Sequence, residues 1–247
     1  MEKKMMVVSA HAADWCTRAG GTIRRMIEEG WDVQVHVLTY GEHGESGAYW
    51  KNNPVSTFEA CKACRKEEAS RAAKMLGVSR IVFYDYGDYP LELHEKQIRG
   101  LTKEILDYRP SVILTHWICD RVNLDHETTG KAVINAVNAA GMLGAFPGVD
   151  SHMIPDIFFF ETTVPQPEFN EFKIDTFINI DSVFEKKMEA VRCFEAQPQL
   201  IGYYTRTAET RGIQASDWAR KRGKVTYAEG FVKYVPYVGE HLPLMEY

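Results

Sequence analysis

The chain has 247 residues, which suits one large α/β domain with a sizeable core, or at most two small domains. A formal charge of −5 and a pI near 5.9 argue against nucleic acid as the main partner, and five cysteines, an odd number, fit free thiols in a reducing cytosol better than a disulfide framework. No apolar run approaches the roughly 18 residues of a membrane span, so we expect a cytoplasmic protein without a membrane partner.

Short apolar runs alternate with helical patterns along the chain. Residues 5–10 are a valine-rich run that predicts a buried strand, and residues 17–29 have helical spacing up to Gly30. A second strand is predicted at 33–39, and a loop with three glycines follows at 41–57. The next predicted elements are a helix at 58–76, a strand at 80–84, a helix at 94–108, a strand at 111–115 and a helix from near Glu127. Strands at 156–161 and 176–180 and helices at 182–195 and 200–211 complete the prediction.

This alternation predicts a Rossmann-like α/β fold, with a mostly parallel sheet and helices on both faces. No internal repeat, linker or low-complexity segment divides the sequence, so we expect a single domain over residues 1–247. Ligands of open α/β sheets bind at the carboxyl ends of the strands. The polar side chains best suited to chemistry follow those ends, namely His11, Glu42, Glu45, Asp88 and the segment 116–126.

A histidine and a carboxylate, His11 and Asp14, share one tight loop after the first strand, and Asp125 and His126 open the helix after the fourth. Neighbouring strands would bring the two loops together. Two histidines and one carboxylate leave an open position, which is the pattern of catalytic zinc, and Asp125 would orient a ligand. The alternative is that His11 simply ends a strand while Asp14 caps the following helix.

These motifs resemble the signature of the LmbE-like, PIG-L-type zinc deacetylases. The similar segments are 9–14 (Ser-Ala-His-Ala-Ala-Asp), 18–21 (Arg-Ala-Gly-Gly) and the Asp-His pair at 125–126. The resemblance extends over essentially the whole chain and implies an LmbE-like fold, a metal-dependent catalytic domain and a Zn²⁺ ion held by His11, Asp14 and His126.

Two positions depart from the deacetylase pattern. Where those enzymes have the aspartate that acts as general base, this chain has Ala13, and where they have a histidine acid, it has Asn123. Alanine cannot move a proton, and an amide is a poor acid at neutral pH. Efficient amide hydrolysis is therefore not expected, although a metal alone can still activate water.

One branch of the superfamily, the 4-oxalomesaconate hydratases of bacterial gallate-type catabolism, matches these departures. It is similar at 9–14 with 18–21, at 41–46 (Gly-Glu-His-Gly-Glu-Ser), at 87–90 (Gly-Asp-Tyr-Pro), at 123–126 (Asn-Leu-Asp-His), and in the tail at 203–206, 211–215 and 227–230. A histidine that this branch has after the Phe-Glu pair at 160–161 is replaced here by Thr162 and Thr163. The resemblance implies a zinc-dependent hydratase that adds water to the double bond of an unsaturated tricarboxylate.

The candidate catalytic set is Glu45, Asn123 and Asp125. Glu45 is preferred for acid–base work, with Glu42 as its rival, because a glycine-rich loop can bring a carboxylate close to a ligand. Arginine forks match carboxylates, so the candidate substrate-binding residues are Arg18, Arg65, Asp88, Arg206 and Arg211. The expected partner is a small anionic carboxylate, and we expect a homo-oligomer. The alternatives are a zinc-dependent N-deacetylase of an acetylated amino sugar and a non-catalytic metal-dependent binding module.

Overall fold

The computed structural model describes residues 2–153, 156–163, 168–219 and 223–243. Within these ranges, seven strands form one sheet in the order β3-β2-β1-β4-β5-β7-β6. Their bounds are β1 Lys4–Ser9, β2 Asp32–Val37, β3 Arg80–Phe83, β4 Val112–His116, β5 Asp156–Phe160, β6 Thr176–Asn179 and β7 Ala228–Lys233. The first five run parallel, and β7 lies antiparallel between β5 and β6.

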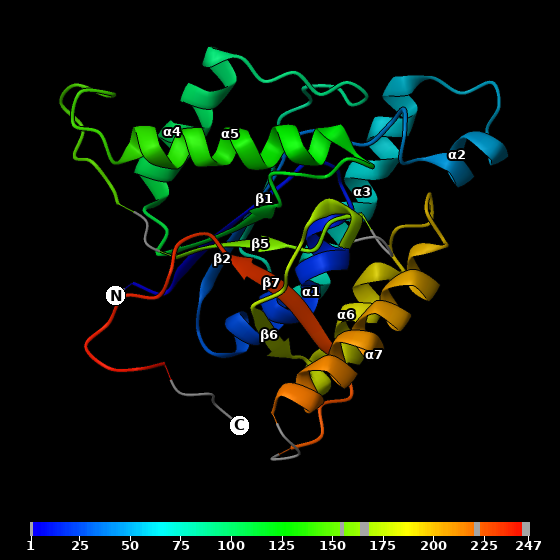
Figure 1. Ribbon diagram of the computed structural model, residues 1–247. Coiled ribbons are helices and arrows are strands. Elements are labelled where there is room, and N and C mark those ends of the chain that lie inside the picture. The colour runs from blue at the N-terminus through cyan, green and yellow to red at the C-terminus, as the bar shows by residue number, and fades with distance from the viewer. Residues whose placement is uncertain (1, 154–155, 164–167, 220–222, 244–247) are drawn as a thin grey trace.

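Helices cover both faces of the sheet (Figure 1). One face carries α1 (Asp14–Glu28), α3 (Phe58–Leu76), α6 (Phe184–Val191) and α7 (Leu200–Trp218), and the other carries α4 (Glu95–Tyr108) and α5 (Leu124–Ala140). Successive side chains of β1 point to opposite faces. Met5 and Val7 therefore pack in the first core, while Met6 and Val8 pack in the second. The predicted α/β fold class is confirmed.

The observed helices follow the predicted ones, with shifted ends. The α1 helix begins at Asp14 rather than near residue 17, and α5 begins at Leu124, where the Asn123 side chain accepts the Asp125 amide at 3.2 Å. The α6 helix is shorter than predicted, with a 3₁₀ turn at Asp181–Val183 before it, and α7 is longer. No helix in the described ranges is long and apolar enough to cross a membrane.

Two elements were not predicted. A short helix, α2 (Gly47–Asn52), lies inside the predicted loop, and Trp50 Nε1 donates to the Glu42 carbonyl at 2.6 Å. The strand β7 contains glutamate and glycine, which are poor strand formers. Its Glu229 is buried, accepts the amides of Gly21 and Thr22 in α1 at 2.9 and 2.7 Å, and pairs with Lys187 at 2.8 Å. Contacts this distant in sequence leave no local pattern.

The sheet order decides where the polar loops meet. The β1 strand lies in the sheet between β2 and β4, so the loops after these three strands emerge side by side. They carry His11, Glu45 and the segment that leads to His126. The convergence predicted from the strand-end rule is thus built into the topology.

Candidate active site and metal centre

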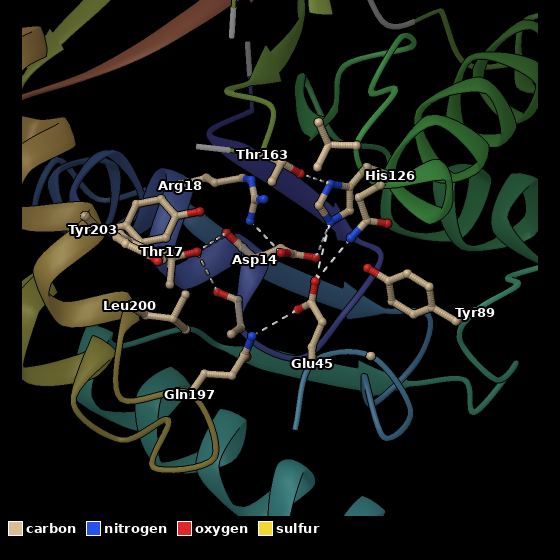
Figure 2. Close-up of a pocket in the computed structure, with 15 residues that line it drawn as sticks. Asp14, Thr17, Arg18, Glu45, Tyr89, His126, Thr163, Gln197, Leu200 and Tyr203 are labelled. Atoms are coloured by element: carbon tan, nitrogen blue, oxygen red, sulfur yellow. Dashed lines mark hydrogen bonds and ion pairs between the residues drawn. The ribbon is translucent and has the colours of Figure 1, made fainter. Parts of the chain in front are cut away.

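Four side chains, from two loops and two helix starts, face a common point. One ligand atom each from His11, Asp14, Glu45 and His126 lies within 4.8 Å of the others. Asp14 Oδ2 is 3.1 Å from His11 Nδ1 and 3.4 Å from His126 Nε2, and Glu45 Oε1 is 3.3 Å from His11 Nδ1. Figure 2 shows Asp14, Glu45 and His126 pointing toward one another across a cavity. The three predicted ligands are therefore together, and Glu45 joins them.

Only one of the two ring nitrogens of His126 has a hydrogen-bond partner among the described residues. Its Nδ1 lies 2.9 Å from Asp120 Oδ2, while its Nε2 is buried without a hydrogen-bond partner among the described residues. Asp120 also accepts the Thr163 amide and hydroxyl, both at 2.9 Å, and hydrogen bonds from Asn170 and from two backbone amides. A histidine that donates one N–H to a carboxylate and presents its other nitrogen is arranged as metal ligands are.

His11 is held in the same way from the other side. Its Nε2 lies 3.2 Å from Asp125 Oδ2, which also accepts the amide of Tyr89 at 2.9 Å, while its Nδ1 faces Asp14 and Glu45. Burial opposes protonation, but the charge of Glu45 and the hydrogen bonds of Asp125 and Asp14 raise the pKa of His11 well above 6.5. Such an excess of negative charge around the His11 imidazole fits a divalent cation, which would take the place of the proton on Nδ1.

A third histidine, His116, lies behind the cluster. Its Nε2 accepts the Ala10 amide at 2.9 Å, and its ring stacks on His126 with centroids 4.2 Å apart. Burial, followed by the neighbouring charge of His126, lowers the pKa of His116 to about 3. It is therefore a neutral packing partner of His126.

A cavity of about 200 Å³ opens beside the cluster. Its walls are Ala13, Asp14, Thr17, Arg18, Gly44, Glu45, Tyr89, Val122, Asn123, His126, Thr163, Gln197, Leu200, Tyr203 and Tyr204. Arg18 supplies its guanidinium: Nη1 donates to Asp14 Oδ1 and Nε donates to the Glu161 carbonyl at 2.9 Å. The cavity thus combines the guanidinium of Arg18, the carboxylates of Asp14 and Glu45, and several neutral hydrogen-bond donors.

The structure separates the two glutamates of the loop after β2. Glu45 lies on the cavity wall, where Asn123 Nδ2 donates to Oε1 at 3.2 Å and Gln197 Nε2 approaches Oε2 at 3.5 Å. Glu42 is buried, does not line the cavity, and has Lys62 Nζ at 3.4 Å. Burial raises the pKa of Glu42. The geometry favours Glu45 for contact with a ligand.

The two positions at which the chain departs from the deacetylases both lie on the cavity wall. Ala13 contributes a methyl group, and Asn123 contributes an amide that is already bonded to Glu45. Thr163, at the place of the histidine found in the hydratase branch, also lines the cavity and donates its hydroxyl to Asp120. None of these three side chains titrates near neutral pH.

Of the four candidate arginines, the structure brings only Arg18 to the cavity. Arg65 is fully buried and donates to Glu68, to Gln197 and to the Tyr40 carbonyl. Its guanidinium is therefore not free to bind substrate, contrary to the prediction.

Arg211 is buried against Glu161 and donates to Gln214, so it too is already paired. Arg206 is exposed and does not line the cavity. Asp88 turns away from the cavity and accepts the amides of His43 and Gly44, so it holds the loop that carries Glu45. Motif membership did not distinguish a ligand contact from a buried structural pair.

Three residues of the site were not singled out from the sequence. Asp120 lies six positions before His126, Gln197 lies in a turn before α7, and Tyr89 stands next to the predicted Asp88. The only sequence signal for Tyr89 was its place in the segment 87–90. Asp120 lies in the segment 116–126 that follows the fourth strand, whereas Gln197 carried no signal, because its partners Arg65 and Glu45 are distant in the chain.

The chain is similar to known proteins over most of its length. The family model PIG-L, described as GlcNAc-PI de-N-acetylase, matches residues 6–137. A 4-oxalmesaconate (4-oxalomesaconate) hydratase of Pseudomonas putida is 37% identical over 246 residues, covering 98% of this chain and 93% of the relative. A diacetylchitobiose deacetylase of Thermococcus kodakarensis is 30% identical, covering 97% and 86%. The crystal structure of the 4-carboxy-2-hydroxymuconate hydratase from Pseudomonas putida superposes with a TM-score of 0.92 at 36% identity, covering 98% of this chain and 100% of that one.

Proposed function

The chain belongs to the PIG-L family, and from that premise we propose that it is a zinc-dependent hydratase that adds water to the carbon–carbon double bond of an unsaturated tricarboxylate such as 4-oxalomesaconate, in the catabolism of aromatic acids. A relative and a solved structure from Pseudomonas putida, both named as hydratases and both similar over nearly the whole chain, support this reaction class. The deacetylase relative is less similar.

One observation carries the proposal. Glu45 is the carboxylate on the cavity wall that has no lysine or arginine partner among the described residues, whereas Ala13 and Asn123 offer no titrating group. Asp14 is turned to the histidines and Arg18. Addition of water needs a group that takes a proton from water and returns one to carbon, and Glu45 is the carboxylate that the described part of the cavity wall offers for this role.

His11, Asp14 and His126 would hold the zinc ion, and Glu45 lies close enough to approach it. The ion supplies a Lewis acid that polarises an oxygen and lowers the pKa of a water molecule. Asp120 and Asp125 hold the two imidazoles so that their free nitrogens face inward. Arg18 presents its guanidinium on the cavity wall and supports binding of a substrate carboxylate.

The size of the cavity favours a compact substrate. At about 200 Å³ it is smaller than the roughly 300–1,000 Å³ of pockets for drug-sized ligands. With Asp14 and Glu45 opposed by Arg18, the walls alone carry net negative charge. A divalent cation reverses that sign, so anion binding depends on the metal.

The second candidate is a zinc-dependent N-deacetylase of an acetylated amino sugar. The family model and the 30% identical deacetylase favour it. Ala13 and Asn123 weigh against it, because they stand where the deacetylases have their proton-transfer groups. Zinc alone would have to activate the attacking water.

Turnover of two substrates by one preparation tests the choice. Zinc-loaded protein is offered 4-oxalomesaconate, with loss of the double bond followed by absorbance, and N-acetylglucosamine derivatives, with acetate release measured. We expect hydration without acetate release, and loss of hydration when the metal is removed by a chelator and its return when zinc is restored. Robust acetate release without hydration would transfer the assignment to the deacetylase. Tight binding of both substrates without turnover would indicate a binding module.

We further propose that residues 1–247 form a single catalytic domain that acts in the cytoplasm as a homo-oligomer. Support for one domain comes from the two cores, which pack on opposite faces of the same sheet. Light scattering of the zinc-loaded protein measures the assembly.

A further inference from the structure

Two neighbouring polar side chains of the segment 87–90, Asp88 and Tyr89, point in different directions. Asp88 is turned inward, where it accepts the amides of His43 and Gly44 at 3.1 and 2.9 Å. Tyr89, the next residue, lines the cavity and is 47% exposed. The side chain of this segment that a ligand can reach is thus the tyrosine.

Three contacts hold the Tyr89 ring in place. Its amide donates to Asp125 Oδ2 at 2.9 Å, and its ring stacks on the His11 imidazole with centroids 5.8 Å apart and planes at 13°. The ring also covers Gly44 so closely that a Cβ there would lie 2.1 Å from Tyr89 Cε2. Only glycine leaves room for this arrangement.

The Tyr89 hydroxyl is the donor that the site leaves unused. It has no hydrogen-bond partner within the part of the chain that the structure describes, while the Asn123 amide is bonded to Glu45 and the Thr163 hydroxyl to Asp120. Figure 2 shows the hydroxyl directed into the cavity, on the side opposite Arg18. A phenol is protonated at neutral pH, so it offers a hydrogen to a ligand oxygen.

We propose that Tyr89 is a catalytic residue whose hydroxyl donates a hydrogen bond to a carboxylate oxygen of the substrate, opposite the carboxylate that Arg18 binds. The proposal rests on the hydratase function. As the water oxygen bonds to one carbon of the double bond, the π pair moves toward the other carbon and its conjugated carboxylate. Glu45 takes one proton from the water as the hydroxyl bonds to carbon and then returns that proton to the other carbon, so that one water is added across the double bond and Glu45 is a carboxylate again.

Tyr89 keeps its own proton throughout. The oxygen it contacts gains negative charge during the addition, so the hydrogen bond strengthens in the transition state. Loss of the hydroxyl should therefore lower kcat as well as weaken binding. A residue that only packs against His11 would affect neither through its hydroxyl.

The test compares wild type with Tyr89→Phe, which removes one oxygen and keeps the ring. We expect kcat/KM for 4-oxalomesaconate to fall about 10²-fold, and the affinity for tricarballylate, a saturated tricarboxylate, to fall about tenfold by calorimetry. Zinc content and melting temperature should not change. Tyr237→Phe, an exposed tyrosine outside the cavity, is the matched control. Gly44→Ala, which displaces the ring and keeps the hydroxyl, should reproduce the loss.

Each outcome separates this inference from the hydratase proposal. If wild type hydrates the substrate and Tyr89→Phe keeps kcat/KM and tricarballylate affinity within about twofold, well below the loss expected of a hydrogen bond to a charged group, the role of Tyr89 is wrong and the hydratase stands. If wild type does not hydrate the substrate but Tyr89→Phe weakens tricarballylate binding, the hydratase function is wrong, and the hydrogen bond from Tyr89 to a ligand carboxylate is supported. If wild type neither hydrates the substrate nor binds tricarballylate, both are wrong.

Discussion

Replacement of Glu45 by glutamine is the most direct probe of the proposed chemistry. Glutamine has the same shape, and its carbonyl oxygen can still accept the Asn123 amide that lies 3.2 Å from Oε1. Its amide nitrogen cannot accept from Gln197, but at 3.5 Å that hydrogen bond is already weak. The structural cost of the change is therefore small, and the titrating group is what disappears.

The expected loss in kcat is about 10²-fold or more, because general acid–base catalysis contributes about 10²–10⁴-fold. That corresponds to at least about 2.7 kcal/mol of transition-state stabilisation. Zinc content should be unchanged, since His11, Asp14 and His126 remain. The assay is steady-state hydration of 4-oxalomesaconate by zinc-loaded protein, paired with elemental analysis of the same preparation.

Glu42→Gln is the matched control, because Glu42 belongs to the same loop but is buried beside Lys62 and does not line the cavity. We expect its kcat to stay within about threefold of wild type, far from the 10²-fold loss of an acid–base group. The reasoning is refuted if Glu45→Gln keeps its kcat while Glu42→Gln is inactive. If Glu45→Gln loses its zinc as well as its activity, Glu45 is a metal ligand and the acid–base assignment is wrong.

The remaining predictions concern the metal and the arginines. His126→Ala should lose most of its bound zinc, and elemental analysis that finds one zinc per chain would contradict this. Asp120→Asn should weaken zinc affinity about 10- to 100-fold in a chelator competition, because the amide no longer fixes the imidazole; unchanged affinity would count against the orienting role. Arg18→Leu should lower kcat/KM by about 1–3 kcal/mol, and unaltered kinetics would remove Arg18 from the substrate site. Arg65→Leu should instead lower the free energy of unfolding by about 3 kcal/mol in urea, since Glu68 loses its buried partner, and a raised KM with normal stability would restore the sequence-based assignment.

The topology was accessible from sequence because strand and helix patterns are local and the rule that joins them is general. Strands at 5–10 and 111–115 were predicted, and the strand-end rule placed the loops that bear His11 and His126 at one edge of the sheet, while the structure shows that the two strands are neighbours. The helix at 58–76 was predicted with its observed bounds, and the structure gives the reason: Thr57 accepts the Ala60 amide at its start, and Gly77 adopts a left-handed conformation at its end. These are signals that single residues carry.

The parts that were missed depend on distant partners. An arginine in a motif has the same sequence appearance whether it faces a cavity, as Arg18 does, or is enclosed by its own partners, as Arg65 is. The role of Asp120 is set by its hydrogen bonds with Thr163 and Asn170, which follow the neighbouring strand β5 and lie more than 40 residues away in the chain. For such groups, burial and pairing are properties of the packed molecule.

Because β7 contacts α1, the complete site can form only late in synthesis of the chain. The ligands are all made by residue 126, but α1, which carries Asp14, is held by Glu229 through the amides of Gly21 and Thr22. The ribosome must complete the strand up to Lys233 before that link exists. Until then the Gly21 and Thr22 amides lack this acceptor, so we expect the nascent chain to acquire zinc only after the last strand has joined the sheet.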